Sequence, residues 1–574
     1  HSDITGAGFD LNGVDPRKLK LTNRDTEITI YLPGEGDGVF NPGDTLLFYG
    51  VAITDIYTTE NIYWLSEGSA NGQRMATRDG TPQGATVPVH FPVTLYLEED
   101  RTYWQAMPSG AGQDHWFWSS ITAPASRDYD VSITNISTSA STATVRLGMK
   151  GFTDIPALNP DHHTTIYVNG NDVEPGGQWW DGQIIFEQQI NIAHNILING
   201  LNTIKLKSVG DTGAAVDRIY LNWIEIEYWD TYVSETDELQ LGAPSNGTFQ
   251  FEVTNFSTNS IDLFDITDAG NVVRVINANI LDDGGTYRLQ FQDNAQLQTR
   301  YLALAPAQRK TAASLTLDQP SAWKSGSNGA DYIIITHEDF YDSTQPLADH
   351  RSGQGLRVAR VKVGDIYDEF NHGIFNPQAI RDFLAYAYDH WTPPGPTYVL
   401  LVGDANYDYR DVFNTGRINY VPAQNVETDL LGETPSDNWF VSVDGNDIVP
   451  DMFIGRLTAQ QASQTDNMIS KIIQYEQNSP GFFWNDQVIL VADDDSFAFE
   501  STSDELASLL PANFTANKVY ASNYPPGNPT DDIDSNINGG RLLVNYTGHG
   551  NSTEWGSWSG GKIYNTNNIL ALNN

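Results

Sequence analysis

Residues 539–556 have the sequence GGRLLVNYTGHGNSTEWG, and this stretch decides the fold class of the C-terminal part of the chain. Its apolar run LLVNY has the composition of a strand that is covered on both faces, as in a parallel sheet. The run leads to His549, which stands between Gly548 and Gly550. Because both neighbours lack side chains, the stretch predicts an uncrowded imidazole that moves protons, beside a Gly550 N–H that is free to bind an oxyanion.

The segments before this stretch alternate between apolar strands and amphipathic helices. Strands are predicted at 331–337, 397–404, 486–495 and 540–550, and helices at 376–391, 465–477 and 502–511. Alternation of this kind packs as a parallel or mostly parallel sheet with right-handed crossovers. We therefore expect an α/β domain over residues 328–574.

Three of the predicted strands end in chemically functional groups, namely Asp404, the run Asp493–Asp495, and His549. In open α/β sheets, ligands bind at the carboxyl ends of the strands. We therefore expect these groups to meet at one rim of the sheet. For Asp404, ordinary turn chemistry or helix capping is the alternative explanation.

The chain before residue 323 has the pattern of all-β domains, with short alternating strands separated by glycine-rich turns. Residues 1–118 form a first β domain, and 119–232 have the spacing of a β-sandwich or jelly roll. Residues 233–322 continue as strands, and two arrangements remain open for them. They either form a separate segment, or they pack with 1–118, in which case the sandwich is an insertion. KSGSNGA at 324–330 is the expected linker.

Two aromatic and histidine pairs stand out in the predicted sandwich. His162-His163 is interpreted as a pair in an exposed loop, without the spacing of a zinc site. Trp179-Trp180 lies beside glycine-rich turns, which is compatible with carbohydrate binding. The alternative for these tryptophans is that they are core or rim aromatics of the sandwich.

Composition excludes several classes of protein. The 574 residues carry a formal net charge of −42, which would repel nucleic acid. No apolar run reaches the ~18 residues that a transmembrane helix needs. We expect a secreted or cell-surface protein, and we interpret His1 as a processed or truncated N-terminus. The chain contains no cysteine, and therefore neither disulfides nor a nucleophilic thiol.

Several stretches together resemble one family. The histidine stretch is similar to the histidine segment of the gingipain-type cysteine peptidases, family C25, which have a caspase-like α/β fold. SDNWFVSVDGNDIVPDMFIGRLTA (436–459), YVLLVGDANYD (398–408) and VILVADDDS (488–496) resemble other parts of that family. The resemblance implies a secreted cysteine endopeptidase that acts on protein or peptide substrates and is subject to proteolytic processing.

The resemblance also implies roles for particular residues. His549 would be the general base that activates a thiol, Gly550 would supply one oxyanion donor, and Asp495 matches the acid that orients the imidazole. Asp504, at the start of the next predicted helix, lies near the position where arginine-selective members keep a specificity carboxylate. The alternative for Asp504 is a helix N-cap beside Ser503.

The family's nucleophilic cysteine belongs to the strand after the histidine, which would fall beyond Asn574. Either the thiol lies on a missing or separate companion fragment, or the domain is a catalytically dead relative. We favour the companion fragment, because a parallel sheet that ended here would expose an apolar edge. Two other functions remain open: a sortase or transpeptidase of the same family linked to secretion, and a non-enzymatic surface or structural protein.

Calcium is the one cofactor that we expect, as a structural ion, since gingipain-like domains bind it. GEGDGVFNPGDTLLF (34–48) resembles the second half of a dockerin-like Ca²⁺ loop, with a plain β-turn as the alternative, and SVDGNDIVPD (442–451) is a second oxygen-rich loop. The candidate ligands are Asp37 and Asp44 in the first loop, and Asp444, Asn446 and Asp447 in the second. Zinc is not expected, because the chain has no cysteine and no HExxH pairing.

Overall fold

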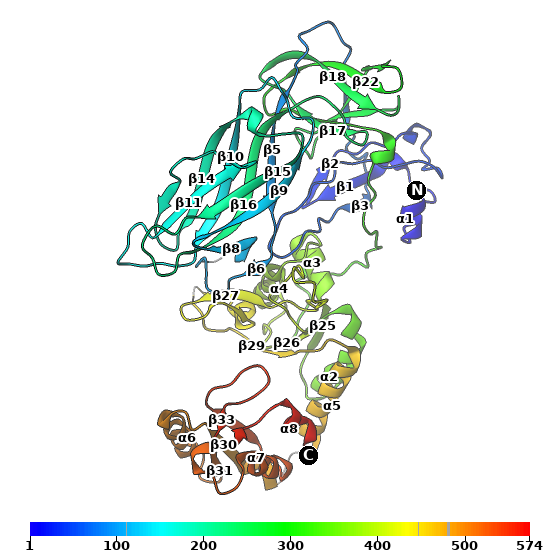
Figure 1. Ribbon diagram of the computed structural model, residues 1–574. Coiled ribbons are helices and arrows are strands. Elements are labelled where there is room, and N and C mark those ends of the chain that lie inside the picture. Colours follow the sequence, from blue (N-terminus) through cyan, green and yellow to red (C-terminus); the bar gives the residue numbers. More distant parts are fainter. Residues whose placement is uncertain (111, 446, 479–482, 574) are drawn as a thin grey trace. The chain divides into compact units, whose positions relative to one another are not determined.

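The computed structural model describes residues 1–110, 112–445, 447–478 and 483–573 (Figure 1). It divides into an N-terminal unit, His1–Thr465, and a C-terminal unit, Asp466–Asn574, which are described separately. Asn446, one of the candidate calcium ligands, lies outside the described residues. No helix among the described residues combines the length and the apolarity needed to cross a membrane.

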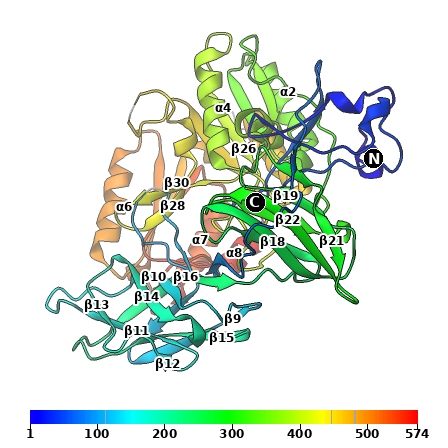
Figure 2. The same ribbon diagram turned by 90° about the horizontal axis from the view of Figure 1, so that it is seen from above.

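Two antiparallel sheets pack face to face in the N-terminal unit (Figure 2). The first has the order β14 (Ile185–Ala193), β10 (Thr142–Gly151), β16 (Arg218–Asp230), β5 (Phe91–Glu98), with β8 (Ser119–Thr122) also pairing with β16. The second has the order β12 (Asn171–Asp172), β11 (His162–Val168), β15 (Gly200–Ser208), β9 (Ala125–Ile133), with β13 (Gln178–Trp180) pairing with β11. Alternate residues such as Leu147 and Leu206 form one shared core. Strand β5 belongs to this region although it precedes residue 119.

The rest of the β part consists of four smaller sheets. One has the order β2 (Thr26–Ile28), β1 (Leu19–Asn23), β3 (Trp64–Glu67), and another has the order β17 (Glu238–Gly242), β23 (Arg300–Leu304), β19 (Asp262–Asp265), β20 (Val273–Ile276), β4 (Ala76–Asp79). A third has the order β18 (Gly247–Phe256), β22 (Tyr287–Ala295), β21 (Asn279–Asp282), and the fourth is the pair β6 (Thr102–Tyr103) and β7 (Trp116–Phe117). The parallel pairing of β4 with β20 joins segments that flank the two-sheet region in sequence. Residues 233–322 therefore pack with the first segment. A short helix α1 (Ser2–Gly6) begins the chain.

A parallel four-stranded sheet follows in the same unit, in the order β25 (Val358–Lys362), β24 (Tyr332–Thr336), β26 (Tyr398–Val402), β29 (Phe453–Leu457). Its helices and hairpin are α2 (Gln345–Gly353), α3 (Val363–Asn371), α4 (Pro377–His390), β27 (Gln424–Thr428) and β28 (Gly432–Ser436). Helix α4 begins after Asn376, whose side chain accepts the N–H of Gln378. Its residues Phe383 and Leu384 are fully buried against the sheet core, as the helical spacing predicts.

The C-terminal unit contains a second parallel sheet. Strand β30 (Gln487–Ala492) lies between β31 (Thr515–Tyr520) and β32 (Leu543–Thr547), and both pairings are parallel. The other elements are α6 (Phe497–Leu509), α7 (Pro529–Asn538), α8 (Thr566–Ala571), β33 (Ser557–Trp558) and β34 (Gly561–Lys562), while α5 (Ala462–Asn478) crosses the division between the units. The predicted fold class, all-β domains followed by an α/β region with parallel sheets, is confirmed.

Three local predictions were wrong. The run LLVNY forms β32 but is not covered on both faces, since Leu543 and Val544 are 51% and 36% exposed. Helix α6 begins at Phe497 and not near residue 502, because the Ser496 hydroxyl caps it by accepting the N–H of Ala498. His162 and His163 lie buried on β11 and not in an exposed loop. Their burial is possible because each imidazole is paired with a carboxylate, Asp217 for His162 and Asp211 for His163.

Candidate active site

His549 and Asp495 meet at the carboxyl ends of two adjacent strands. Asp495 follows β30 and His549 follows β32, and the parallel register pairs Ala492 with Thr547. The chain therefore leaves both strands at the same rim, and the Nδ1 atom of His549 lies 3.0 Å from the Oδ2 atom of Asp495. This is the arrangement that the strand-end argument predicts for these two residues.

The geometry assigns different tasks to the two ring nitrogens of His549. A carboxylate only accepts hydrogen bonds, so the Nδ1 atom facing Asp495 carries a proton. In the neutral ring, the Nε2 atom then has the free lone pair. The side chain is 71% exposed, and the ring of Phe499 packs edge-to-face on it at 5.2 Å. The site therefore presents an accessible base whose ring is supported on one side.

Gly550 carries a backbone donor that is available to a ligand. It lies in the exposed turn after His549, and its N–H makes no hydrogen bond to any described residue. By contrast, the N–H of the next residue is engaged: Asn551 donates it to the carbonyl of Glu554 at 2.9 Å. An N–H that is not engaged by the described residues and stands next to the base can serve as an oxyanion donor.

Sequence reasoning missed Tyr546, and it named Asp493 only as part of the acidic run at the strand end, without a role of its own. The carboxylate of Asp493 accepts the backbone N–H of His549 at 3.1 Å, and the hydroxyl of Tyr546 donates to the His549 carbonyl at 2.6 Å. Asp493 is fully buried. The available signal was the position of Asp493 directly after a buried strand, but its sequence pattern resembles an ordinary acidic turn.

Asp504 lies in the second half of helix α6, so it neither starts the helix nor caps it. Its Oδ1 atom accepts from the Lys518 ammonium and from the Tyr520 hydroxyl, each at 2.6 Å. These hydrogen bonds, with the charge of Lys518, lower the pKa of Asp504. The carboxylate is therefore ionised and already has a cationic partner.

Asp404 makes contacts typical of a turn in the N-terminal unit. Its Oδ1 atom accepts the N–H of Ala405 at 3.0 Å, and its Oδ2 atom accepts the side-chain amide of Gln460 at 2.7 Å. This agrees with the turn chemistry given above as its alternative. The residues that the structure brings together at one rim are Asp495 and His549.

The candidate calcium ligands make hydrogen bonds typical of turns. Asp37, Asp44 and Asp447 each accept a backbone N–H from a residue two to three positions away, at 3.0, 2.7 and 2.9 Å, and the N–H of Asp444 donates to Asp451. None of these candidate ligands belongs to a cluster of three acidic or histidine side chains among the described residues. Two clusters of three potential ligands occur elsewhere in the described chain: Asp493, Asp495 and His549; and Glu98, Asp100 and Asp114.

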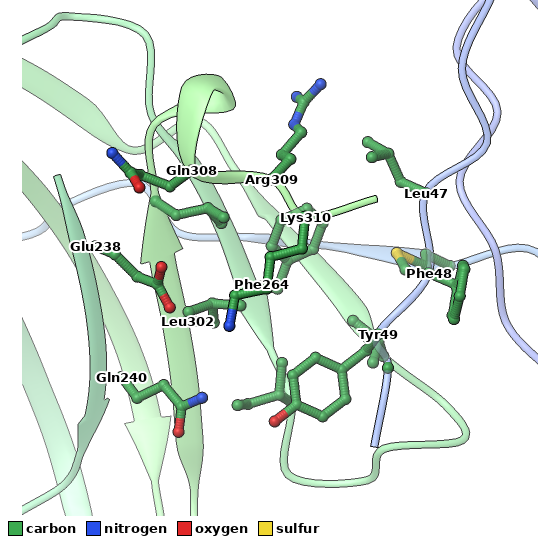
Figure 3. A pocket seen from close by; sticks show the side chains of 15 residues that line it. Leu47, Phe48, Tyr49, Glu238, Gln240, Phe264, Leu302, Gln308, Arg309 and Lys310 are labelled. Carbon is green, nitrogen blue, oxygen red and sulfur yellow. The ribbon is translucent and has the colours of Figure 1, made fainter. Parts of the chain in front are cut away.

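A cavity of about 270 Å³ lies in the N-terminal unit, and none of the predicted site residues lines it (Figure 3). One wall is formed by the segment around Phe48 and Tyr49, and the opposite wall by Glu238 and Gln240 on β17. Its floor is apolar and includes Phe264. None of these residues belongs to the peptidase-like pattern.

Comparisons with known proteins find relatives for the α/β region. The model of peptidase family C25 matches residues 325–574. Gingipain R2 of Porphyromonas gingivalis is 28% identical over 234 residues, which cover 39% of this chain and 28% of the relative. Lys-gingipain of the same species is 27% identical over 230 residues, covering 39% of this chain and 12% of the relative. The match thus spans less than a third of these relatives.

The crystal structure of dimeric latent PorU from P. gingivalis has the same fold over a longer stretch. The similarity has a TM-score of 0.56 and covers 83% of this chain and 48% of that chain, at 16% sequence identity.

The α/β region and its histidine–carboxylate pair have the arrangement expected of a cysteine-peptidase-like domain. Residues 325–574 match the model of peptidase family C25 and are similar to the gingipains.

Proposed function

We propose that this chain supplies the general base, its orienting acid and one oxyanion donor of a secreted, gingipain-like cysteine endopeptidase. The observation that carries the proposal is the 3.0 Å contact between His549 and Asp495 at the carboxyl rim of the C-terminal sheet. The free N–H of Gly550 beside this pair supports the oxyanion role. The strongly acidic composition, with a net charge of −42, is compatible with an extracellular location.

The proposed reaction is acyl transfer through a thioester. The Nε2 atom of His549 takes the thiol proton, the thiolate attacks the peptide carbonyl, and Gly550 donates its N–H to the resulting oxyanion. The imidazolium, stabilised by Asp495, then protonates the leaving amine as the C–N bond breaks. Water, deprotonated by His549, attacks the thioester, so that the carboxylic acid and the free thiol are released.

The thiol must come from residues outside these 574, because they contain no cysteine. We place it on a companion C-terminal segment that pairs with β32. This strand is at the edge of its sheet, and its apolar residues Leu543 and Val544 are 51% and 36% exposed. An edge strand presents unpaired backbone groups, so a further strand can add there and cover these side chains.

Preference for a basic residue on the acyl side of the cut is a finer part of the proposal, with Asp504 as the specificity carboxylate. A substrate ammonium or guanidinium would have to replace Lys518 at the Oδ1 atom of Asp504. Because the Lys518–Asp504 ion pair is about half exposed, breaking it for this exchange requires little free energy. The Asp504→Asn variant should then lose discrimination between basic and neutral peptides.

The proposal is tested with a thiol-reactive peptide probe on the gene product that contains both this chain and the companion cysteine. His549→Ala should slow acyl-enzyme labelling by about 1,000-fold or more, and Asp495→Asn by about 100-fold. His390→Ala, at the end of α4, is the matched control and should label normally. Unchanged labelling of His549→Ala would remove its assigned role.

Product analysis of the same reactions separates the two other functions. Joined products instead of hydrolysed ones would indicate a sortase or transpeptidase. Absence of any acyl-enzyme in the unaltered protein would indicate a surface or structural protein, and the peptidase proposal would then be wrong.

We also propose a structural Ca²⁺ ion, with the loops around Asp37 and Asp44 and around Asp444 and Asp447 as the sites. Binding there has to exchange the turn hydrogen bonds of these carboxylates for metal contacts. Calcium should therefore raise the melting temperature of the chain over that in a chelator, and Asp37→Asn with Asp447→Asn should remove the difference. Equal melting temperatures with calcium and with chelator would reject the ion.

A further inference from the structure

Both backbone polar groups of His549 are held by side chains. The Oδ2 atom of Asp493 accepts its N–H at 3.1 Å, and the hydroxyl of Tyr546 donates to its carbonyl at 2.6 Å. His549 lies between the end of β32 and the isolated antiparallel bridge of Gly550 with Trp555. The two side chains therefore replace the ladder hydrogen bonds that would otherwise fix its backbone dihedrals.

The two side chains form a closed network. The Tyr546 hydroxyl lies 3.1 Å from the Oδ2 atom of Asp493 and accepts the N–H of Gly556 at 2.9 Å. The other oxygen of Asp493 accepts the N–H of Asp494 at 2.8 Å. The Tyr546 ring stacks on Trp555 at 4.5 Å with an angle of 3° between the planes. Satisfied networks of this kind are rigid, because each group is costly to leave unpaired.

Two glycines make room for the network. A Cβ atom on Gly548 would overlap the Cβ of Asp493 and the hydroxyl of Tyr546, and a Cβ on Gly556 would overlap the Oδ2 atom of Asp493. Neither glycine has a positive φ. The absence of a side chain at Gly548 is therefore explained by the close approach of Asp493 and Tyr546, and not by a special backbone conformation.

We propose that Asp493 and Tyr546 are positioning residues that fix the backbone of His549 and so aim its imidazole at Asp495. The inference rests on the proposed function, in which that imidazole is the general base. The ring itself is 71% exposed, and among the described residues it is held at Nδ1 by Asp495 and by contact with Phe499. A small rotation of the backbone would move Nε2 away from the thiol, and misplacement by about 1 Å lowers reaction rates by about 100-fold.

The variant that tests this is Tyr546→Phe, which removes only the hydroxyl and keeps the stacked ring. The matched control is Tyr524→Phe, which removes the hydroxyl that bonds Asp532 in the same unit. Amide hydrogen exchange is measured on the 574-residue chain by mass spectrometry. Exchange of the His549 amide should rise by about 10-fold or more in Tyr546→Phe and stay unchanged in Tyr524→Phe.

The second readout is the kinetics of the complete enzyme with its companion thiol. Tyr546→Phe should lower kcat by about 10- to 100-fold with KM unchanged, because substrate contacts are intact while the base is misdirected. Normal exchange at His549 together with normal kcat in Tyr546→Phe would overturn the inference. So would loss of kcat that accompanies general unfolding, seen as faster exchange throughout β30 and β32.

Failure of the proposed function gives a different result. If His549→Ala keeps full activity, the general-base assignment is wrong whatever the exchange data show. If His549→Ala is inactive while Tyr546→Phe behaves like the unaltered protein in both readouts, the peptidase proposal survives and the positioning role is rejected.

Discussion

The imidazole of His549 is largely exposed, yet two contacts restrict its ring and a third restricts its backbone. Asp495 binds Nδ1, Phe499 packs against the ring, and the buried carboxylate of Asp493 holds the backbone N–H. Each contact comes from the chain after β30 or from the start of α6. The base is therefore ordered by its neighbours while Nε2 remains accessible to a reacting group.

Gly548 is the residue whose replacement most directly tests this arrangement. Gly548→Ala places a methyl group against Asp493 and Tyr546, so it should lower the free energy of unfolding by about 1–3 kcal/mol. The control is Gly455→Ala in β29, where an added Cβ meets nothing within 4 Å. Urea unfolding followed by circular dichroism measures both, and equal stabilities of the two variants would contradict the packing described here.

His162 is a second residue with a specific electrostatic state. Its ring is fully buried, with Nδ1 2.6 Å from Asp217 and Nε2 3.1 Å from the carbonyl of Thr153. Both partners accept hydrogen bonds, so both nitrogens carry protons and the ring is an imidazolium. Burial alone lowers its pKa, but the hydrogen bond and charge of Asp217, with the charge of Asp161, outweigh burial and raise it.

The raised pKa predicts a pH dependence of stability. The stabilisation by the His162 pair is complete below the unfolded value of 6.5 and is lost as pH rises through the raised folded value. A tenfold stronger binding of the proton in the folded state corresponds to about 1.4 kcal/mol of stability. Urea unfolding is measured between pH ~6 and ~9 by tryptophan fluorescence, because the Trp180 ring packs on the His162 ring. The free energy of unfolding should fall as pH rises. In His162→Gln it should depend less on pH. An equal slope in the variant would reject the imidazolium.

At the scale of elements, the first turn of helix α6 contains both the N-cap contact of the helix and a residue that packs against the site. Ser496 caps the helix, and Phe499 in the first turn packs against His549. Ser496→Ala should cost about 1 kcal/mol and speed amide exchange in residues 497–501. Ser508→Ala, at the other end of the helix, is the control. If both variants exchange alike in the first turn, the cap does not hold this part of the site.

Local patterns were sufficient to predict most single elements but not their partners. The apolar run at 331–337 predicted β24, and the helical spacing at 376–391 predicted α4. Strand β5 lies outside the predicted sandwich because its partner β16 is more than a hundred residues later, and no local signal identifies that pairing. Likewise, His162 was assigned to a loop because the carboxylate that permits its burial is distant in sequence.

At the scale of the whole molecule, the sequence predicted the class of each half and the central pair of the site. The rule that sites form at the ends of parallel strands brought Asp495 and His549 together, because that rule depends only on strand order and direction. The network of Asp493 and Tyr546 depends on the exact fit of a hydroxyl between two glycines, which no spacing rule encodes. The ion pair of Asp504 with Lys518 likewise could not be predicted, because no spacing rule in the sequence indicates it.

The protein has a large β part and a gingipain-like α/β region. Within the β part, the segments before and after the two-sheet region pair through β4 and β20. In the proposal, the α/β region provides the chemistry. The central claim is therefore that the imidazole of His549 acts on a thiol that another segment brings to the rim of the C-terminal sheet.

Alkylation of that thiol as a function of pH tests this claim most directly. In the complete enzyme the imidazolium of His549 should stabilise the thiolate, so iodoacetamide should react well below the ordinary thiol pKa of about 8.5, and His549→Ala should return the profile to that value. A profile that is already ordinary in the unaltered enzyme, or that His549→Ala leaves unchanged, would contradict the account.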